Sequence, residues 1–199
     1  MRTKTVAVCL AFLTATASCR THAAERLPEA GDLVFETSRS AQSAAIQLAS
    51  GSRWSHVGIV DRAGGEVVVL EALGKVSRTP WKAWTRRARR GGDVLVLRPR
   101  GLTAAQRRAA VAAARRLLGR PYDARFGWGD ERIYCSELVV KAYERGAGVS
   151  YGKRERLGDL RLGGLEAAIE QRWGTIPRDL VLVTPASLAE DPRLERVRW

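Results

Sequence analysis

Two β-rich segments separated by a glycine turn constrain the fold of this chain more than any other feature of its sequence. Residues 56–61 and 66–72 are rich in Val, Ile and Leu, and Ala63-Gly64-Gly65 lies between them. Two such runs around a Gly-Gly pair are typical of a β-hairpin, because glycine adopts the positive φ angles that tight hairpin turns require. The chain is therefore expected to contain an antiparallel sheet built around this hairpin.

The length of the hairpin turn decides which side chains share a face of that sheet. With Gly64-Gly65 as a two-residue loop, residue 63 pairs with residue 66, and Gly58 pairs with Glu71. Glu71 then lies on the same face as His56 and diagonal to it, at a Cβ separation of ~7–8 Å that long side chains can span. A three-residue loop would invert the alternation and separate the two side chains. An ordinary strand-end carboxylate is the alternative interpretation of Glu71.

The rest of the chain combines short strands with separate helices. Strand-like runs occupy residues 33–35, 76–79, 93–97, 179–183 and 194–197, and helical patterns occupy residues 39–50, 80–84, 103–118, 134–145, 163–172 and 185–189. The helix at 103–118 has the clearest signals, because Thr103 and Gln106 form a capping box and Gly119 follows. Antiparallel strands with segregated helices indicate the α+β class.

The first residues have the pattern of a secretory signal peptide. Arg2 and Lys4 precede residues 6–16, an uncharged and mostly apolar stretch that is shorter than the ~20 residues needed to span a bilayer. We expect residues 1–23 to be removed on export and residues 24–199 to form one domain in the periplasm or cell envelope. The alternative is a lipoprotein signal, cleaved before Cys19, that anchors the protein through this residue.

Removal of residues 1–23 would leave very little metal-binding or disulfide chemistry. Of three cysteines and two histidines, only Cys135 and His56 would remain. A disulfide within the domain is then excluded, and a metal site would have at most one imidazole, so we expect neither a metal nor another cofactor. One cysteine with one histidine is the minimum for nucleophilic thiol catalysis.

The basic charge of the chain is concentrated in arginine clusters. The formal net charge is +13, and loss of Arg2, Lys4 and Arg20 with the signal peptide would lower it to +10. The cluster at 86–90 is expected in a loop, and the pairs 107–108 and 115–116 on a solvated helix face. Such a surface attracts anions and could bind an anionic membrane. The alternative is that the arginines reflect a general compositional bias and serve no binding partner. Nucleic acid is not an expected partner, because the sequence has no nucleic-acid-binding motif.

Cys135 lies at the start of the predicted helix 134–145. The dipole and the N-terminal N–H groups of a helix favour a thiolate over a thiol, which lowers the pKa of a cysteine at that position. The same N–H groups can hold an oxyanion. A buried structural cysteine is the alternative, because cysteine packs as a small hydrophobic residue.

Five motifs occur in an order that resembles a known family. They are Gly31-Asp32-Leu33-Val34-Phe35, Ser52-Arg53-Trp54-Ser55-His56-Val57-Gly58-Ile59-Val60, Leu70-Glu71-Ala72, Gly119-Arg120-Pro121-Tyr122-Asp123 and Tyr134-Cys135-Ser136-Glu137-Leu138-Val139. Together they resemble the circularly permuted papain-like cysteine hydrolases of the YiiX/YebB type, which are relatives of the NlpC cell-wall peptidases. In ordinary papain-like enzymes the cysteine precedes the histidine, whereas here His56 precedes Cys135, as the permuted group requires.

The resemblance implies both a fold and a set of site residues. The fold is papain-like (NlpC-type) with circular permutation, an antiparallel sheet packed against helices. The implied triad has Cys135 as nucleophile, His56 as general base and then acid, and Glu71 as the group that orients the imidazole. Further candidates for the substrate cleft or the oxyanion site are Tyr122, Asp123 and Tyr134, and a packing role is the alternative for them.

The expected function is that of an exported cysteine hydrolase. It would cleave an amide or ester bond through an acyl-enzyme, with a cell-wall peptide, an N-acyl compound or a lipid as substrate. Two other functions remain open from the sequence: an envelope-surface binding protein on an inactive hydrolase scaffold, and a thioester acyltransferase.

Overall fold

A computed structural model describes residues 27–199, and the expected signal peptide with Cys9, Cys19 and His22 lies outside the described residues. The strands are β1 (Leu33–Glu36), β2 (His56–Ala63), β3 (Glu66–Leu73), β4 (Lys75–Pro80), β5 (Val94–Pro99), β6 (Arg154–Arg156), β7 (Val181–Val183) and β8 (Leu194–Arg196). The helices are α1 (Ala41–Ser50), α2 (Trp81–Gly91), α3 (Ala104–Arg115), α4 (Cys135–Ala147), α5 (Glu166–Trp173) and α6 (Pro185–Ala189), with a short 3₁₀ turn, η1 (Leu157–Asp159).

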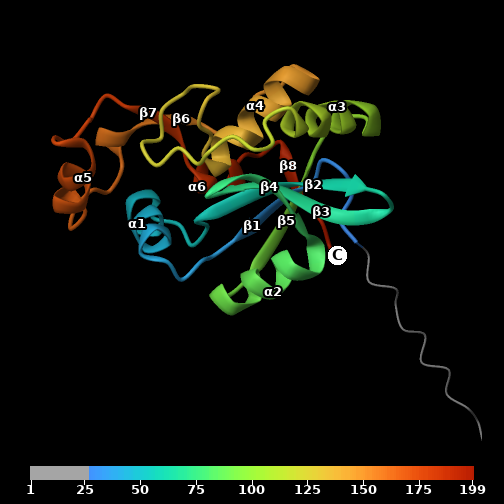
Figure 1. Cartoon of the computed structure of the whole chain (residues 1–199), viewed down its shortest axis with the longest axis horizontal. Coiled ribbons are helices and arrows are strands. Elements are labelled where there is room, and N and C mark those ends of the chain that lie inside the picture. The colour runs from blue at the N-terminus through green and yellow to red at the C-terminus, as the bar shows by residue number, and fades with distance from the viewer. Residues whose placement is uncertain (1–26) are drawn as a thin grey trace, which may run out of the picture.

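Six strands of the described residues form one antiparallel sheet, in the order β4-β3-β2-β1-β5-β8 (Figure 1). The β2–β3 hairpin turns at Gly64 and Gly65, whose φ angles are 60° and 85°. Gly58 pairs with Glu71, so the predicted two-residue loop and its register are confirmed. Strands β6 and β7 pair separately. Strand β6 is not predicted from the sequence, because Arg-Glu-Arg has no alternation of apolar and polar residues.

Helices cover both faces of the large sheet, and the alternation of side chains along the strands explains why. Leu33 and Phe35 pack into the core shared with α3 and α4, whereas Val34 packs into a second core with Trp81 and Trp84 of α2. Figure 1 shows α3 and α4 on one side of the sheet and α2 on the other. The α+β class and the packing of an antiparallel sheet against helices are confirmed.

The α2 helix corrects an expectation about the arginine cluster at 86–90. This cluster was expected in a loop, but it belongs to a helix that begins at Trp81 and continues to Gly91. Trp81, Trp84 and Ala88 recur at helical spacing and are buried against the sheet, which extends the helix through the arginines between them.

The arginines of α3 are also less solvated than expected. Arg107 Nη2 lies 2.9 Å from Glu29 Oε2, and Arg115 Nε lies 2.9 Å from Oδ2 of Asp61, a buried carboxylate of β2. Part of the predicted solvated face therefore pairs with acidic groups of the domain. Thr103 caps α3 through the predicted capping box with Gln106. Within residues 27–199, the structure contains no helix with both the length and the apolar composition needed to cross a bilayer.

Candidate active site

Cys135 is the first residue of α4, and its thiol is buried. The helix start is held in place on both sides: the Tyr134 N–H donates to Glu137 Oε2 (3.2 Å), and the Tyr134 hydroxyl accepts from the Val183 N–H (3.1 Å). The helix packs against β2 as well as α3. This packing brings the thiol to the beginning of β2, where His56 lies.

The imidazole of His56 contacts both Cys135 and Glu71. His56 Nε2 lies 2.7 Å from Glu71 Oε2. The Cys135 thiol is close enough to the imidazole that each group shifts the pKa of the other. Because Nε2 faces the carboxylate, Nδ1 is the ring nitrogen left for the thiol. The residues are 79 positions apart in the sequence and meet only in the folded protein.

Burial and hydrogen bonding act in opposite directions on the pKa values of Cys135 and His56. Burial alone would raise the pKa of the Cys135 thiol and lower that of the His56 imidazole. The attraction between the Cys135 thiolate and the His56 imidazolium outweighs the effect of burial on the thiol pKa, and the Val57 N–H also stabilises the thiolate. The pKa of Cys135 is consequently lowered, and contacts with Cys135 and Glu71 raise the pKa of His56 to about 10. This arrangement favours a thiolate–imidazolium pair at neutral pH.

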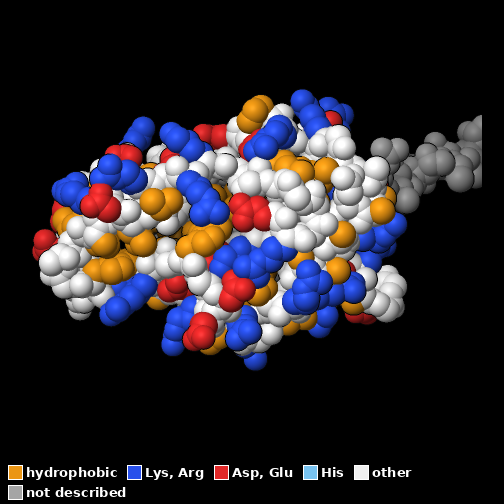
Figure 2. Space-filling model, turned by 90° about the horizontal axis from the view of Figure 1, so that it is seen from above, with side chains coloured by type: hydrophobic (Ala, Val, Ile, Leu, Met, Phe, Trp, Pro, Cys, Tyr) orange, Lys and Arg blue, Asp and Glu red, His pale blue; other side chains and the backbone are white. Residues whose placement is uncertain are grey.

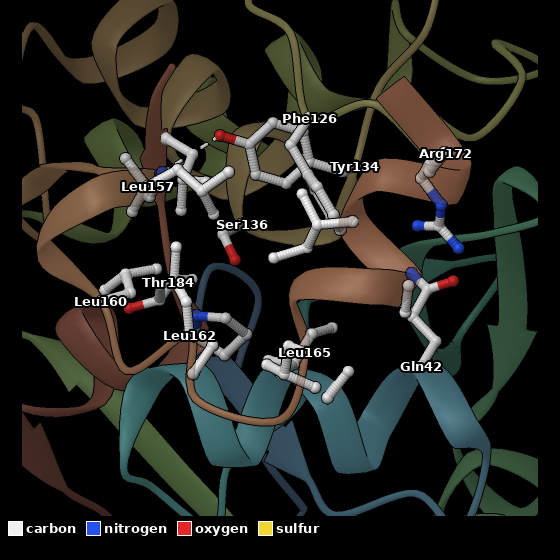
Figure 3. A pocket seen from close by; sticks show the side chains of 18 of the residues that line it. Gln42, Phe126, Tyr134, Ser136, Leu157, Leu160, Leu162, Leu165, Arg172 and Thr184 are labelled. Carbon is white, nitrogen blue, oxygen red and sulfur yellow. Dashed lines mark hydrogen bonds between the residues drawn. The ribbon is translucent and has the colours of Figure 1, made fainter. Parts of the chain in front are cut away.

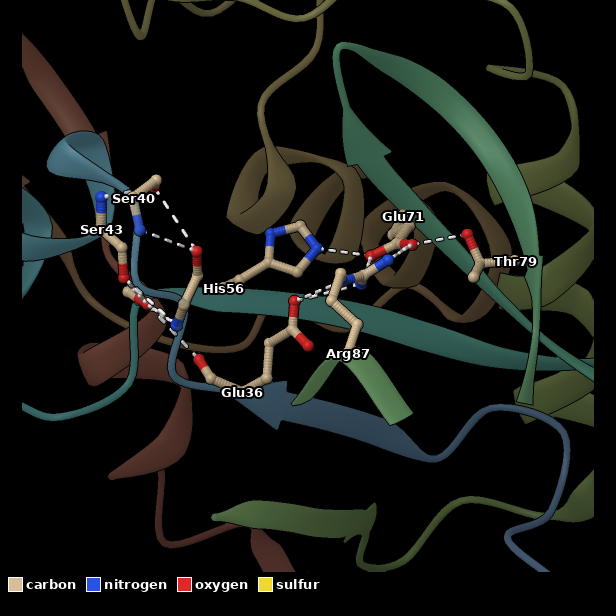
Figure 4. Close-up of polar contacts among 9 residues, drawn as sticks. Glu36, Ser40, Ser43, His56, Glu71, Thr79 and Arg87 are labelled. Atoms are coloured by element: carbon tan, nitrogen blue, oxygen red, sulfur yellow. Dashed lines mark hydrogen bonds and ion pairs between the residues drawn. The ribbon is translucent and has the colours of Figure 1, made fainter. Parts of the chain in front are cut away.

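Glu71 is a buried carboxylate with four hydrogen-bonding contacts (Figure 4). Its Oε1 accepts from Thr79 Oγ1 (2.6 Å) and Arg87 Nη1 (3.0 Å), and its Oε2 accepts from Arg87 Nη2 (2.6 Å) and faces His56. Burial would raise the pKa of Glu71, but His56 and Arg87 hold it at about 2. A Cβ on Gly58 would lie only 2.4 Å from Val69 Cγ1 and would also touch the Glu71 Cβ at 3.4 Å, so a glycine is needed where these side chains pack.

Arg87 and Glu36 belong to the same polar cluster, and sequence reasoning missed both. Arg87 Nε donates to Glu36 Oε1 (3.0 Å), so one guanidinium bridges Glu36 and Glu71. Burial raises the pKa of Glu36, and its Oε2 has no hydrogen-bond partner among the described residues. Arg87 could have been found from the spacing of Trp84 and Ala88, because a helix extended through them turns position 87 toward the sheet.

Tyr122 lies close to Cys135 and is held by a residue that the sequence analysis did not single out. Gln42 Nε2 donates to the Tyr122 hydroxyl oxygen (2.8 Å). Burial, together with the negative charge of Cys135, raises the pKa of Tyr122, so the side chain is a neutral phenol. An amide donor on the oxygen leaves the phenol hydrogen as a donor of its own, which suits an oxyanion beside Cys135.

The other two candidates have different environments. Asp123 accepts from the backbone N–H groups of Arg125 and Gly127, both at 2.8 Å, and so it shapes the loop after Tyr122. Asp123 does not line either of the two pockets that border Cys135 and His56, and it makes no contact that supports substrate binding. Tyr134 lines the pocket beside Cys135, where its hydroxyl holds Val183.

Two pockets that differ in the polarity of their linings border the Cys135–His56 pair. The first, about 860 Å³ when counted out to its open mouth, has the mostly apolar lining shown in Figure 3. Cys135 belongs to this lining. The second, about 580 Å³, has a more polar lining and includes His56 and Glu36. Gln42 and Ile46 of α1 line both, so α1 forms a shared wall beside the reacting groups.

Comparisons with known proteins agree with the geometry. Residues 27–198 match the family described as permuted papain-like amidase enzyme, YaeF/YiiX, C92 family. The uncharacterized protein YiiX of Escherichia coli K12 is 36% identical over 173 residues, which cover 85% of this chain and 86% of YiiX. A crystal structure of YiiX from Escherichia coli O157:H7, described as a metalloprotein, has a TM-score of 0.80 and 37% identity, and the match covers 85% of this chain and 96% of that chain.

The description of that relative as a metalloprotein raises the question of a metal in this chain. Glu36, His56 and Glu71 offer donor atoms within 4.8 Å of one another. However, Arg87 is hydrogen-bonded to both carboxylates, and His56 is engaged by Glu71 on one side and Cys135 on the other. A metal ion would have to displace the guanidinium that already neutralises the carboxylates, so this arrangement does not fit a metal centre.

The order of the site residues distinguishes this chain from ordinary papain-like proteins. His56 comes from an early strand and Cys135 from a later helix, yet the fold unites them in one buried pair. The family match extends over nearly all the described residues, and the resemblance drawn from the sequence motifs is confirmed. The chain therefore belongs to the permuted papain-like amidase family of the YaeF/YiiX type.

Proposed function

We propose that this protein is an exported cysteine amidase that hydrolyses an amide bond through a thioester on Cys135. The observation that carries the proposal is the position of His56, which links the buried Cys135 thiol to the buried carboxylate of Glu71. Export is supported by the signal-like pattern of residues 1–23.

Acylation begins with the Cys135 thiolate. Its sulfur attacks the carbonyl carbon of the amide, and a tetrahedral oxyanion forms. The Cys135 N–H at the start of α4 and the Tyr122 hydroxyl are the donors proposed to stabilise that oxyanion; the free N–H groups of a helix start and the neutral Tyr122 phenol support this assignment. When the C–N bond breaks, the His56 imidazolium gives its proton to the nitrogen, and the amine leaves while the acyl group stays on sulfur.

Deacylation uses the same groups in reverse. Neutral His56 takes a proton from a water molecule, whose oxygen attacks the thioester carbon. The C–S bond then breaks, releasing the acid and restoring the thiolate–imidazolium pair. Throughout, Glu71 fixes the orientation of the imidazole and stabilises its positive charge. Arg87 and Thr79 hold Glu71 in place, so they are positioning residues.

The proposal is tested by assaying amide panels with the wild type and matched variants. Peptidoglycan peptides and N-acyl amines are incubated with each protein, and products and the Cys135 acyl adduct are identified by mass spectrometry. We expect no product from Cys135→Ala and a loss of about 10²–10⁴-fold in rate for Glu71→Gln. Asp61→Asn is the control, because it alters a buried carboxylate of the same hairpin that pairs with Arg115 instead.

Two outcomes would contradict the amidase proposal. One is equal product release by the wild type and Cys135→Ala, which would exclude the thiol as nucleophile. The other is transfer of the acyl group to an added amine or alcohol with no release of free acid, which would identify an acyltransferase. Protease protection in intact cells, together with the N-terminal sequence of the purified protein, tests export separately.

A further inference from the structure

We propose that the substrate is a long-chain N-acyl amide, with the aliphatic chain in the apolar pocket beside Cys135 and a small polar amine part beside His56. This inference rests on the amidase function proposed above and specifies its substrate class. It follows from the chemical character of the two pockets and from their positions relative to the reacting groups.

The apolar pocket is built for a flexible hydrocarbon chain. Its walls come from α1, from the segment that follows η1, from α5 and from β7. Aliphatic and aromatic side chains dominate the lining, among them Leu160, Leu162, Leu165, Ile169 and Trp173. Figure 3 shows the leucine side chains around the cavity, with Gln42 and Arg172 together on one side of it.

The positions of Cys135 and His56 fix the direction of the substrate. In an amide, the carbonyl carbon carries the acyl chain on one side and the nitrogen on the other. The sulfur attacks that carbon and His56 protonates the nitrogen, so the amine part has to lie on the histidine side. Cys135 lines the apolar pocket and His56 lines the polar one. The acyl chain is thereby assigned to the apolar pocket.

The polar pocket matches the other half of such a substrate. Its lining includes the hydroxyl groups of Ser38, Ser40 and Ser55, together with Glu36. The buried Ser55 hydroxyl already accepts from the Ser38 N–H and the Ser43 hydroxyl, whereas Oε2 of the buried Glu36 has no hydrogen-bond partner among the described residues. A ligand in this pocket can therefore supply a donor to Glu36. A small hydroxylated or amino-bearing amine has the donor that Glu36 needs, whereas a second hydrocarbon chain would leave this carboxylate oxygen unpaired.

Apolar side chains also lie on the surface at the end of the molecule that carries the apolar pocket. Hydrophobic side chains gather there, among Lys and Arg side chains, at the end that carries α5 (Figure 2). Leu48 of α1, the helix that forms one wall of the pocket, is 49% exposed and adds to this apolar surface. A chain longer than the pocket can therefore extend over apolar surface instead of entering water.

The first test is a chain-length series of N-acylethanolamines, from acetyl through octanoyl to hexadecanoyl, with release of ethanolamine as the readout. We expect kcat/KM to rise with chain length by about three- to fourfold per methylene group until the pocket is filled. Ala45→Phe narrows the pocket from α1 and should reduce kcat/KM for the hexadecanoyl substrate about tenfold or more, while leaving the acetyl substrate unchanged. Ala44→Phe is the control, because Ala44 is exposed on the same helix and does not line the pocket.

The outcomes separate this inference from the proposed function. Cleavage that requires Cys135 but is insensitive to chain length would overturn the acyl-chain assignment and leave the amidase intact. A second measurement needs no catalysis: dibrominated stearic acid should quench tryptophan fluorescence in Cys135→Ala, and the quenching should largely disappear when Trp173→Phe is added. Absence of quenching would also overturn the inference, whether or not any amide is cleaved.

Discussion

At the scale of single residues, Cys135 and His56 titrate as a pair, which gives the thiol a distinctive pH dependence. The pKa of Cys135 is lowered and that of His56 is raised to about 10, so the ion pair exists at pH values between the two. Alkylation of Cys135 by iodoacetamide should therefore remain fast well below the ~8.5 of an ordinary cysteine. Amide hydrolysis should decline as pH rises through about 10, because the imidazolium then loses the proton that the leaving amine needs.

The measurement is the alkylation rate of Cys135 across the pH range, followed by mass spectrometry. In His56→Gln the thiolate loses its partner, so alkylation at neutral pH should slow and the profile should shift toward that of an ordinary thiol. A wild-type profile that already matches a free cysteine would contradict the thiolate–imidazolium pair.

Arg87 is expected to act on the reaction through Glu71. Arg87→Gln removes three hydrogen bonds to Glu36 and Glu71, which raises the pKa of Glu71 and frees the carboxylate to move. We expect kcat to fall with little change in KM, the acid limb of the pH profile to move to higher pH, and the stability to drop by about 1–3 kcal/mol. Arg87→Lys should restore part of kcat, and Arg86→Gln should have no effect because Arg86 is exposed on the same helix.

The result that would argue against this role is a loss of stability in Arg87→Gln with an unchanged pH profile. Arg87 would then be a structural ion-pair partner without influence on His56. Kinetics across pH and chemical denaturation, applied to the same three variants, distinguish the two cases.

At the scale of elements, the contact between α3 and α4 sets the position of Cys135. A Cβ on Gly146 of α4 would lie only 2.4 Å from the backbone oxygen of Ala109 on α3, so the two helices can approach this closely only at a glycine. Gly146→Ala should force the helices apart and destabilise the protein by about 1–3 kcal/mol. Gly163→Ala is the matched control, because it has open space around the added methyl group and should be close to neutral.

Thermal or urea unfolding of the two variants checks this prediction. Because α4 begins with Cys135, we also expect slower Cys135 alkylation in Gly146→Ala than in Gly163→Ala. Equal stability of both variants would show that the helix pair can shift without cost.

The elements that could be predicted from sequence are those whose signals are local. The Gly64-Gly65 turn sets the register of β2 and β3, and that register alone predicts that Glu71 lies diagonal to His56. The Gln42–Tyr122 contact joins residues 80 positions apart. No periodicity encodes such a contact, because it depends on how separate elements pack. Arg87 is not predicted as a site residue because a charged side chain is expected on the solvent-exposed surface. The apolar residues of α2 pack against the sheet and turn Arg87 toward it.

At the scale of the whole molecule, the large sheet separates two tasks. The face toward α2 holds the polar groups that support His56, while the face toward α3 and α4 forms the larger core from which Cys135 begins its helix. The two faces of the sheet have separate apolar clusters, so the charged groups around His56 do not interrupt the larger one. This arrangement accounts for a site that is buried and polar inside a domain of ordinary apolar packing.

The distribution of charge over the molecule predicts binding to anionic membranes through the end that carries the apolar pocket. Residues 24–199 have a formal net charge of +10, because only Arg2, Lys4 and Arg20 among charged residues precede them. Arg125 and Arg161 are exposed and adjoin Phe126 and Leu162 of the pocket lining. We expect sedimentation with vesicles that contain phosphatidylglycerol, weakening from ~0.05 M to ~0.5 M NaCl because screening shortens the range of the attraction.

Charge reversal at each end of the molecule decides whether that orientation is correct. Arg125→Glu with Arg161→Glu should abolish most of the vesicle binding, whereas Arg108→Glu with Arg116→Glu should retain it, since these residues lie on or just after α3 and away from the pocket. Both double variants change the net charge by the same amount, so a difference between them reports position and not total charge. Equal losses would mean that the protein is attracted by its overall charge and has no preferred face toward the membrane.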